Sequence, residues 1–581
     1  MNTTKNIFFG IVFTILSTLV LVLGAEFALF VGNKALKVQR FSVINHSAVD
    51  VPASKLYPKH PEQYLKIAVF GGSAARGYNS ERAFSDMLPS LLEGQVNGDK
   101  KVFVRNYAED GRPFHRFEAE LAVEAAPRYD VLIVYAGTNE SLNYFDDIRY
   151  FLKPEHKHVD LTAKPNITMM DRVAEGKSEE PVTDFFERKS RLYALALRIT
   201  DSIKARLKPK SSSQATNYFR NAQFKVFEPN HVVSPSEREK LNQNFARDLK
   251  RVVEQAKTHG KKVVFMTETP DETFTPFCSV IEERLDSKRR GAIEAAFLEA
   301  QDFYEKKQPG KAETLLRGVL GQSPGLAAAL HLQGLIAFDS ERWPEAWKNF
   351  RAAIDNDCFP FRTLTPLHQT MSTVASQYDN VTVVDAAAFF RKLRQSAYSA
   401  EELFSDVVHP NILGHYVLAL LVVKGMDQTG ATHASESIDA KLNGDLRAAA
   451  QAMAEHLLVT QEERNTSDFY RARWNLSMAF RSGNSKKYLE WSRAQIKNYI
   501  KMVGDTSAEV GDGYMYLSLT YAVGGDTAQA VQWLNEAYRR EPGRVMHRYA
   551  TDVTATGNSI RSILDGASIE FDPKANAFHK R

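Results

Sequence analysis

Five short apolar segments constrain the fold of this chain more than any other feature. They cover residues 66–70, 102–104, 130–135, 262–266 and 381–384, and each is rich in β-branched residues with few polar interruptions. This pattern is typical of parallel strands that are covered on both faces. Helical patterns lie between several of these segments, so the sequence predicts a doubly wound α/β domain with a parallel sheet.

Length and composition limit the remaining possibilities. The chain has 581 residues, which is too long for a single core, and its 44% apolar and 25% charged residues are typical of globular proteins. The formal net charge is only +4, without a basic stripe, which argues against a dedicated nucleic-acid binder. Cys278 and Cys358 are too few for a disulfide scaffold or a zinc cluster, and a single bridge and two unpaired thiols both remain open.

The N-terminal segment has the composition of a membrane anchor. Residues 7–24 are uncharged and mostly apolar, and this character continues to residue 32 with Glu26 as the only charge. About 20 helical residues span the hydrocarbon core, so we expect a transmembrane anchor over residues 7–31 and a linker over residues 32–63. A cleaved signal peptide is the alternative. The flanking basic residues weakly favour a cytoplasmic globular part, although long domains translocate regardless of such charges.

Helical repeats interrupt and follow the predicted sheet. Within residues 291–360 small and bulky positions recur with a period of 34, as in the recurrence of Ala312 at Ala346. That period predicts a pair of tetratricopeptide-like repeats, with ordinary amphipathic hairpins as the alternative. Similar spacing near the C-terminus predicts a second helical, tetratricopeptide-like domain over residues 432–560, followed by a tail over residues 561–581.

The first predicted strand ends in a glycine turn that carries a serine. The order Gly71-Gly72-Ser73 fits neither a dinucleotide-binding fingerprint nor a phosphate-binding loop, because the required glycine and lysine positions are occupied by other residues. Ser73 would be exposed at the carboxyl end of a strand and at the start of a helix, where developing negative charge is favoured. The alternative is a serine that only caps this helix.

Three other strand ends carry candidate polar groups. Gly111 follows the second strand and could offer an unobstructed backbone N–H, while Asn139 follows the third and could offer a side-chain amide to an oxyanion. Beyond the fifth strand, Pro410 places His409 on an extended loop, and Asp406 lies three residues upstream. A carboxylate at that spacing could orient the imidazole, which could then deprotonate a serine. Taken singly, each of these segments is also consistent with an ordinary turn or a helix cap.

Together these segments resemble the sequence blocks of the SGNH (GDSL-like) hydrolase superfamily, and within it a membrane-anchored bacterial subgroup with tetratricopeptide-like repeats. The resemblance covers residues 64–290 and 361–428, with an insertion at 145–240. Two positions depart from the usual blocks: Gly72 stands where aspartate is usual, and so does Glu140. The resemblance implies a flavodoxin-like, three-layer α/β/α domain with a parallel sheet, joined to all-α repeats and one N-terminal transmembrane helix.

The resemblance also implies site residues and a reaction. Ser73 would be the nucleophile, His409 the base and Asp406 its orienting carboxylate. The backbone N–H groups of Ser73 and Gly111 and the amide of Asn139 would form the oxyanion hole. No metal or organic cofactor is implied. Further residues that could contact substrate are Arg76, Arg112 and Glu140, and the two arginines could instead simply be solvated.

The expected function is hydrolysis of O-acyl esters, for example O-acetyl groups, on an envelope glycan or lipid. An O-acyltransferase that uses the same residues is one alternative, and a catalytically idle scaffold whose repeats bind a protein partner is another. Such a chain would be a single-pass inner-membrane protein with its globular part on the periplasmic side. We expect an acylated substrate, the lipid bilayer and a protein partner at the repeats, but no nucleic acid.

Overall fold

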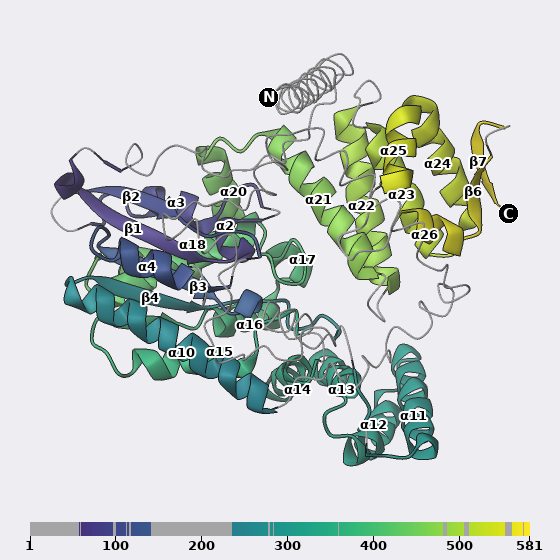
Figure 1. Cartoon of the computed structure of the whole chain (residues 1–581), viewed down its shortest axis with the longest axis horizontal. Coiled ribbons are helices and arrows are strands. Elements are labelled where there is room, and N and C mark those ends of the chain that lie inside the picture. The colour runs from purple at the N-terminus through teal and green to yellow at the C-terminus, as the bar shows by residue number, and fades with distance from the viewer. Residues whose placement is uncertain are drawn as a thin grey trace, which may run out of the picture. The chain divides into compact units, whose positions relative to one another are not determined.

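The computed structural model describes residues 57–140 and 235–580, apart from short gaps at 59, 79, 97–99, 112, 115–117, 277–278, 283, 358–359, 480–484, 505–509, 552–559 and 573–574 (Figure 1). The predicted anchor, most of the predicted linker and insertion, Arg112 and both cysteines lie outside the described residues. Among the helices described, none is long and apolar enough to span a bilayer. From His60 onward the described residues belong to one compact unit.

The predicted parallel sheet is confirmed. Its strands are β1 (Tyr64–Gly71), β2 (Lys101–Asn106), β3 (Val131–Ala136), β4 (Lys262–Thr267) and β5 (Val381–Val384), and each overlaps one of the predicted segments. Every neighbouring pair is parallel, and the order is β2-β1-β3-β4-β5. The chain therefore reverses its direction of winding between β1 and β3, and ligands of such sheets bind at the carboxyl ends of the strands beside this point.

Helices cover both faces of the sheet (Figure 1). On one face α3 (Phe84–Leu91), α16 (Ala386–Ser396) and α18 (Ile412–Gln428) share a buried apolar cluster with alternate residues of β1 and β3. On the other face α4 (Ala119–Ala125) and α15 (Thr365–Ala375) pack against α10 (Pro235–Thr258). Burial on two faces explains why the central strands are apolar throughout instead of alternating.

Two helical hairpins are inserted between β4 and β5. They consist of α11 (Ser287–Glu305) with α12 (Pro309–Gln322), and α13 (Ala327–Asp339) with α14 (Trp343–Asp355). Ala312 and Ala346 are both fully buried, each on the second helix of its hairpin. The first helix begins a few residues before the predicted start at residue 291. The tetratricopeptide assignment of these hairpins stays a prediction.

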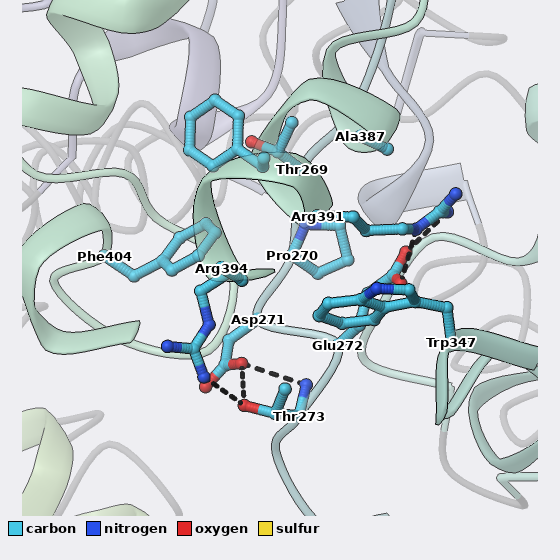
Figure 2. A pocket seen from close by; sticks show the side chains of 11 residues that line it. Thr269, Pro270, Asp271, Glu272, Thr273, Trp347, Ala387, Arg391, Arg394 and Phe404 are labelled. Atoms are coloured by element: carbon cyan, nitrogen blue, oxygen red, sulfur yellow. Dashed lines mark hydrogen bonds and ion pairs between the residues drawn. The ribbon is translucent and has the colours of Figure 1, made fainter. Parts of the chain in front are cut away.

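A small pocket lies where the inserted hairpins meet the α/β domain (Figure 2). Its wall combines Trp347 of α14, residues of α16 and the loop after β4, and its volume is about 280 Å³ including the open mouth. Arg394 of α16 donates a hydrogen bond to Thr273 Oγ1 at 3.2 Å across one side of it. Neither Ser73 nor His409 lines this pocket, so it is separate from the candidate catalytic residues.

The C-terminal part differs from the sequence prediction at both of its boundaries. The remaining elements are α19 (Ser435–Leu442), α20 (Leu446–His456), α21 (Gln461–Ala479), α22 (Ser485–Val503), α23 (Val510–Val523), α24 (Thr527–Arg540), α25 (Pro542–Thr551), α26 (Ile560–Gly566), β6 (Ile569–Asp572) and β7 (Ala577–Lys580). Helices α19 and α20 bury Ile438 and Leu446 in the core of the α/β domain, which therefore extends beyond the predicted end at residue 428.

Within the predicted tail over residues 561–581, the described residues form most of α26 and the strands β6 and β7. Helix α26 and the antiparallel pair β6–β7 bury Ile569 and Phe578 in the core of the preceding helices. The two strands are too short to give a clear alternating pattern, and their apolar contacts become visible only in the tertiary structure. We use the term C-terminal helical region for the elements from α21 to β7.

The end of β1 requires a glycine, which gives a first testable prediction. Gly71 has φ 154°, and a Cβ there would lie 2.1 Å from the backbone oxygen of Tyr135. We expect Gly71→Ala to lower the free energy of unfolding by about 2–4 kcal/mol, measured by urea denaturation. Gly291→Ala in α11 is the matched control: no described atom lies within 4 Å of its Cβ position, so it should raise stability by about 0.5–1 kcal/mol. Equal stability of Gly71→Ala and wild type would contradict this.

Candidate active site

Ser73 lies at the carboxyl end of β1 as the first residue of α2 (Ser73–Arg76). The N-cap of this short helix is Gly72, whose carbonyl accepts the amides of Ala75 and Arg76 at 3.0 and 3.1 Å. Gly77, with φ 90°, ends the helix in the left-handed region. Because Gly72 occupies the cap position, the Ser73 hydroxyl is not used as the helix cap and points elsewhere.

His409 and Asp406 lie on one closed loop between α17 (Ala400–Leu403) and α18. The loop is fastened at its base, where Ser405 N donates to the His409 carbonyl at 2.7 Å and Asn411 N donates to the Leu403 carbonyl at 3.0 Å. Asn411 also caps α18 by accepting two backbone amides. We call residues 404–411 the histidine loop.

The structure brings Ser73, His409 and Asp406 into one hydrogen-bonded line. His409 Nε2 lies 2.7 Å from Ser73 Oγ, and His409 Nδ1 lies 2.7 Å from Asp406 Oδ2. The other carboxylate oxygen, Asp406 Oδ1, accepts the backbone amides of Val408 and His409, both at 2.9 Å. The Asp406 side chain is completely buried. The carboxylate therefore fixes both the imidazole and the backbone that carries it.

Electrostatics around His409 favour its protonated form. Burial on its own lowers the pKa of this imidazole, but the charge of Asp406 and its hydrogen bond raise it, with smaller contributions from Asp110 and Glu268. The net result is a pKa above the ordinary histidine value. A histidine in this setting can accept a proton from a hydroxyl and hold it as a stabilised imidazolium.

The loop after β2, which carries Gly111, is tied to the serine turn. Asn106 donates from Nδ2 to the Ala75 carbonyl at 2.9 Å and accepts the Ala108 amide at 2.9 Å through Oδ1. Gly111 is exposed with φ 70°, and apart from its own chain neighbours no described atom lies within 4 Å of the position a Cβ would take. A backbone at such a position can approach a ligand closely.

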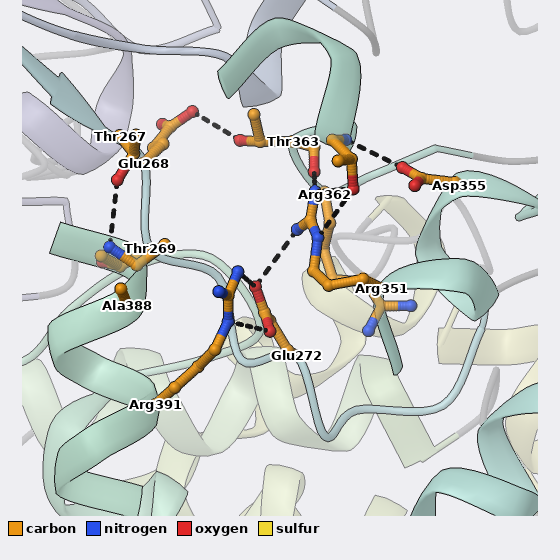
Figure 3. A network of polar contacts seen from close by, with 12 residues as sticks. Thr267, Glu268, Thr269, Glu272, Arg351, Asp355, Arg362, Thr363, Ala388 and Arg391 are labelled. Atoms are coloured by element: carbon orange, nitrogen blue, oxygen red, sulfur yellow. Dashed lines mark hydrogen bonds and ion pairs between the residues drawn. The ribbon is translucent and has the colours of Figure 1, made fainter. Parts of the chain in front are cut away.

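Asn139 follows β3 and is buried next to a pair of carboxylates. Glu140 accepts the backbone amide of Phe114, and Glu268, at the end of β4, accepts the backbone amide of Thr138. Figure 3 shows the second bond of Glu268, with Thr363 Oγ1 at 3.1 Å. The two glutamate side chains thus tie Thr138, on one side of Asn139, to the end of β4, and Glu140, on the other side, to the loop beyond Gly111.

The predicted substrate contact of Glu140 does not match this position. Its side chain is buried, one carboxylate oxygen holds Phe114, and the other has no hydrogen-bond partner among the described residues. Burial, and then the nearby charge of Glu268, raise the pKa of Glu140 to about 8. Glu140 is therefore protonated at neutral pH, and it has a structural role beneath the site in place of a contact with substrate.

The raised pKa of Glu140 makes stability depend on pH. The folded state retains a proton that the unfolded state releases above about pH 4.5, so the free energy of unfolding should fall as pH rises from there to about 8. Glu140→Gln removes this titration. We expect its stability relative to wild type to increase by on the order of 3 kcal/mol between about pH 5 and about pH 8, measured by denaturant unfolding. A difference between Glu140→Gln and wild type that stays flat over this pH range would refute the prediction.

The other predicted contact residues have different positions. Arg76 donates to Asp110 Oδ2 at 2.7 Å and is partly exposed, so it ties the serine helix to the loop after β2. Arg112 lies outside the described residues. An aromatic residue that the sequence did not single out, Tyr78, is exposed, and its ring centroid lies 4.9 Å from that of His409. The exposed ring of Tyr78 therefore packs against the imidazole of His409.

A second polar cluster fastens the loop after β4. Glu272 accepts from Arg351 of α14 at 3.2 Å and from Arg391 of α16 at 2.8 Å (Figure 3). The backbone of this loop also reaches the histidine loop, because Asp271 N donates to the Val407 carbonyl at 2.7 Å. Glu268 could have been found from the sequence, since it directly follows the fourth strand, whereas Glu272 and its arginines carry no comparable local signal.

Comparisons with known proteins add little to this geometry. The sequence matches no family model and no curated protein. Among solved structures, protein YxiM of Bacillus subtilis is similar over 63% of this chain and 56% of its own chain, with 12% sequence identity and a TM-score of 0.25. The match thus spans little more than half the length of that protein. At this level of similarity neither fold nor activity can be transferred, and functional inference rests on the side chains around Ser73.

Proposed function

We propose that this protein is a serine ester hydrolase of the SGNH type, with Ser73 as nucleophile, His409 as general base and Asp406 as its orienting carboxylate. The observation that carries the proposal is the unbroken line of short hydrogen bonds from Ser73 Oγ through both ring nitrogens of His409 to Asp406. A serine, a histidine and a buried carboxylate in this order are what nucleophilic acyl transfer requires.

The proposed reaction has two halves. His409 Nε2 takes the proton of Ser73 Oγ while the oxygen attacks the ester carbonyl, and the imidazolium then gives that proton to the departing alcohol. Water next loses a proton to His409 and attacks the acyl-enzyme. The bond from Oγ to the acyl carbon then breaks, which releases the carboxylic acid, and His409 returns the proton to Ser73 Oγ. Asp406 holds the tautomer and stabilises the imidazolium in both halves.

The oxyanion is proposed to bind to the backbone N–H groups of Ser73 and Gly111 and to the amide of Asn139. The positive φ of Gly111, which lets its backbone approach a ligand closely, supports the part of Gly111. The bonds of Glu140 and Glu268, which fasten the backbone near Asn139, support the part of Asn139. One donor of this kind contributes about 3–4 kcal/mol in comparable sites.

As substrate we propose O-acyl groups, for example O-acetyl groups, on an envelope glycan or lipid. The exposure of Tyr78, whose ring centroid lies 4.9 Å from that of the buried His409, supports access for an acyl group that is carried on a larger molecule. We also propose that residues 7–31 anchor the chain in the inner membrane, with the globular part in the periplasm. Alkaline phosphatase fused to the C-terminus should be active if this orientation is correct and inactive if it is reversed.

The test of the function is turnover by the full chain in detergent. We expect hydrolysis of p-nitrophenyl acetate and of at least one acetylated sugar or lipid in a panel, with the released acid measured by mass spectrometry. Addition of a sugar acceptor separates the alternatives, since an O-acyltransferase would form acylated sugar in place of free acid. A folded protein that turns over no ester in the panel would contradict the proposal and favour an idle scaffold.

A further inference from the structure

The histidine loop is packed on its outer side into the C-terminal helical region. Val407 and Val408, the two residues between Asp406 and His409, are 2% and 3% exposed. Both belong to the same buried apolar cluster as Phe469 and Leu476 of α21. The loop therefore presents its two polar side chains toward Ser73 and its two valines toward another part of the fold.

One arginine of α21 joins the two segments that carry the candidate catalytic residues. Arg471 Nε donates to Ser405 Oγ at 3.1 Å, and Ser405 immediately precedes Asp406. The same guanidinium donates to both carboxylate oxygens of Glu81, each at 3.2 Å, and Glu81 lies between α2 and α3 on the serine side. Arg471 and Glu81 have side-chain exposures of 12% and 5%, so the ion pair is largely buried and has little contact with water.

A second ion pair holds the same helix against the serine side. Arg82 donates to Glu463 of α21 at 2.8 Å and to the Leu457 carbonyl at 3.3 Å. Two neighbouring residues of the serine side thus bind α21, and one of them shares its arginine with the histidine loop. Helix α21 is therefore fixed both to the histidine loop and to the segment between α2 and α3. A planar guanidinium that binds one acceptor on each segment sets the relative position of the two segments more strictly than an ammonium group could.

We infer that Arg471 is a positioning residue for the proposed esterase, because it holds the histidine loop at the correct distance from Ser73. The C-terminal helical region, which carries Arg471, is thereby part of the catalytic apparatus. This inference rests on the proposed function. Displacement of His409 by about 1 Å would be enough to lower the rate by on the order of 100-fold, because the 2.7 Å contact between Nε2 and Ser73 Oγ must be kept.

The test uses Arg471→Lys in the full chain. It keeps the positive charge beside Glu81 and Asp468 but loses the Nε–H group that donates to Ser405. We expect kcat per active site to fall by about 10–100-fold with KM changed by no more than about twofold. Arg447→Lys is the matched control: Arg447 links α20 to Glu402 of α17 at 2.5 Å without touching the histidine loop, and its activity should stay within about twofold.

Hydrogen exchange provides a readout that does not depend on turnover. In Arg471→Lys the amides of residues 405, 408 and 409, which are bonded within the histidine loop, should exchange faster, while those of β3 should not. Ser405→Ala, which removes only the acceptor on the loop, should give a smaller change of the same kind. Unchanged exchange and unchanged kcat in Arg471→Lys would overturn the inference. An inactive wild type would contradict the proposed function alone, because the exchange result would still decide the positioning role.

Discussion

Replacement of Ser73 by alanine should lower kcat for p-nitrophenyl acetate by about 10⁴-fold or more, to the level of the uncatalysed background or slightly above it. Ser73 Oγ is the group that His409 Nε2 contacts at 2.7 Å, and alanine leaves no nucleophile at the carboxyl end of β1. The cap of α2 is formed by Gly72, so the substitution removes no helix-capping bond. Stability should therefore stay within about 1 kcal/mol of wild type.

Ser437→Ala is the control for this loss. Ser437 is exposed on α19, and its hydroxyl donates only a local bond to the Ala434 carbonyl at 3.1 Å. Its activity should equal that of wild type. Retention of turnover in Ser73→Ala, with both proteins folded by circular dichroism, would show that another residue is the nucleophile.

Replacement of Asp406 by asparagine should be almost as damaging, with a loss of about 10⁴-fold in kcat near neutral pH. The asparagine oxygen can still accept the amides of Val408 and His409, so the histidine loop is kept while the charge is removed. Without the carboxylate, burial dominates and the pKa of His409 falls. The acid limb of the pH–rate profile should therefore move to lower pH in the variant.

Asp427→Asn is the matched control for the loss of an aspartate that caps a loop. Asp427 accepts the backbone amides of Ala434 and Ser435 at 2.7 and 3.0 Å, but it lies at the end of α18, away from Ser73. Its activity should remain within about twofold of wild type. If Asp406→Asn kept wild-type kcat and an unshifted acid limb, Asp406 would have no part in the chemistry.

The sheet was predictable because its strands are buried from both sides. Every residue of β3 is buried, so this strand appears in the sequence as an uninterrupted apolar run. The same logic leads to Ser73 and Asn139, because polar residues directly after such runs lie at one edge of the sheet. His409 and Asp406 could be selected through the proline that follows them and their spacing on one loop.

What the sequence did not show are the contacts between distant segments. Arg471 reaches Ser405 and Glu81 across 66 and 390 residues of sequence, and an arginine on an amphipathic helix is ordinarily solvated. Glu140 was named as a possible substrate contact, whereas its side chain is buried and accepts the backbone amide of Phe114. The folding of residues 560–580 likewise depends on a core that earlier helices supply. In each case tertiary packing decides the environment of a side chain whose local sequence is uninformative.

The most direct test of the central claim is covalent labelling of the folded protein with a fluorophosphonate, followed by intact mass and peptide mapping. We predict a single adduct on Ser73, formed by displacement of fluoride by Oγ, with a labelling rate that rises with pH as His409 loses its proton. Labelling should be strongly reduced in Asp406→Asn. The absence of an adduct on Ser73 in folded wild-type protein, or an adduct on another serine instead, would contradict the account.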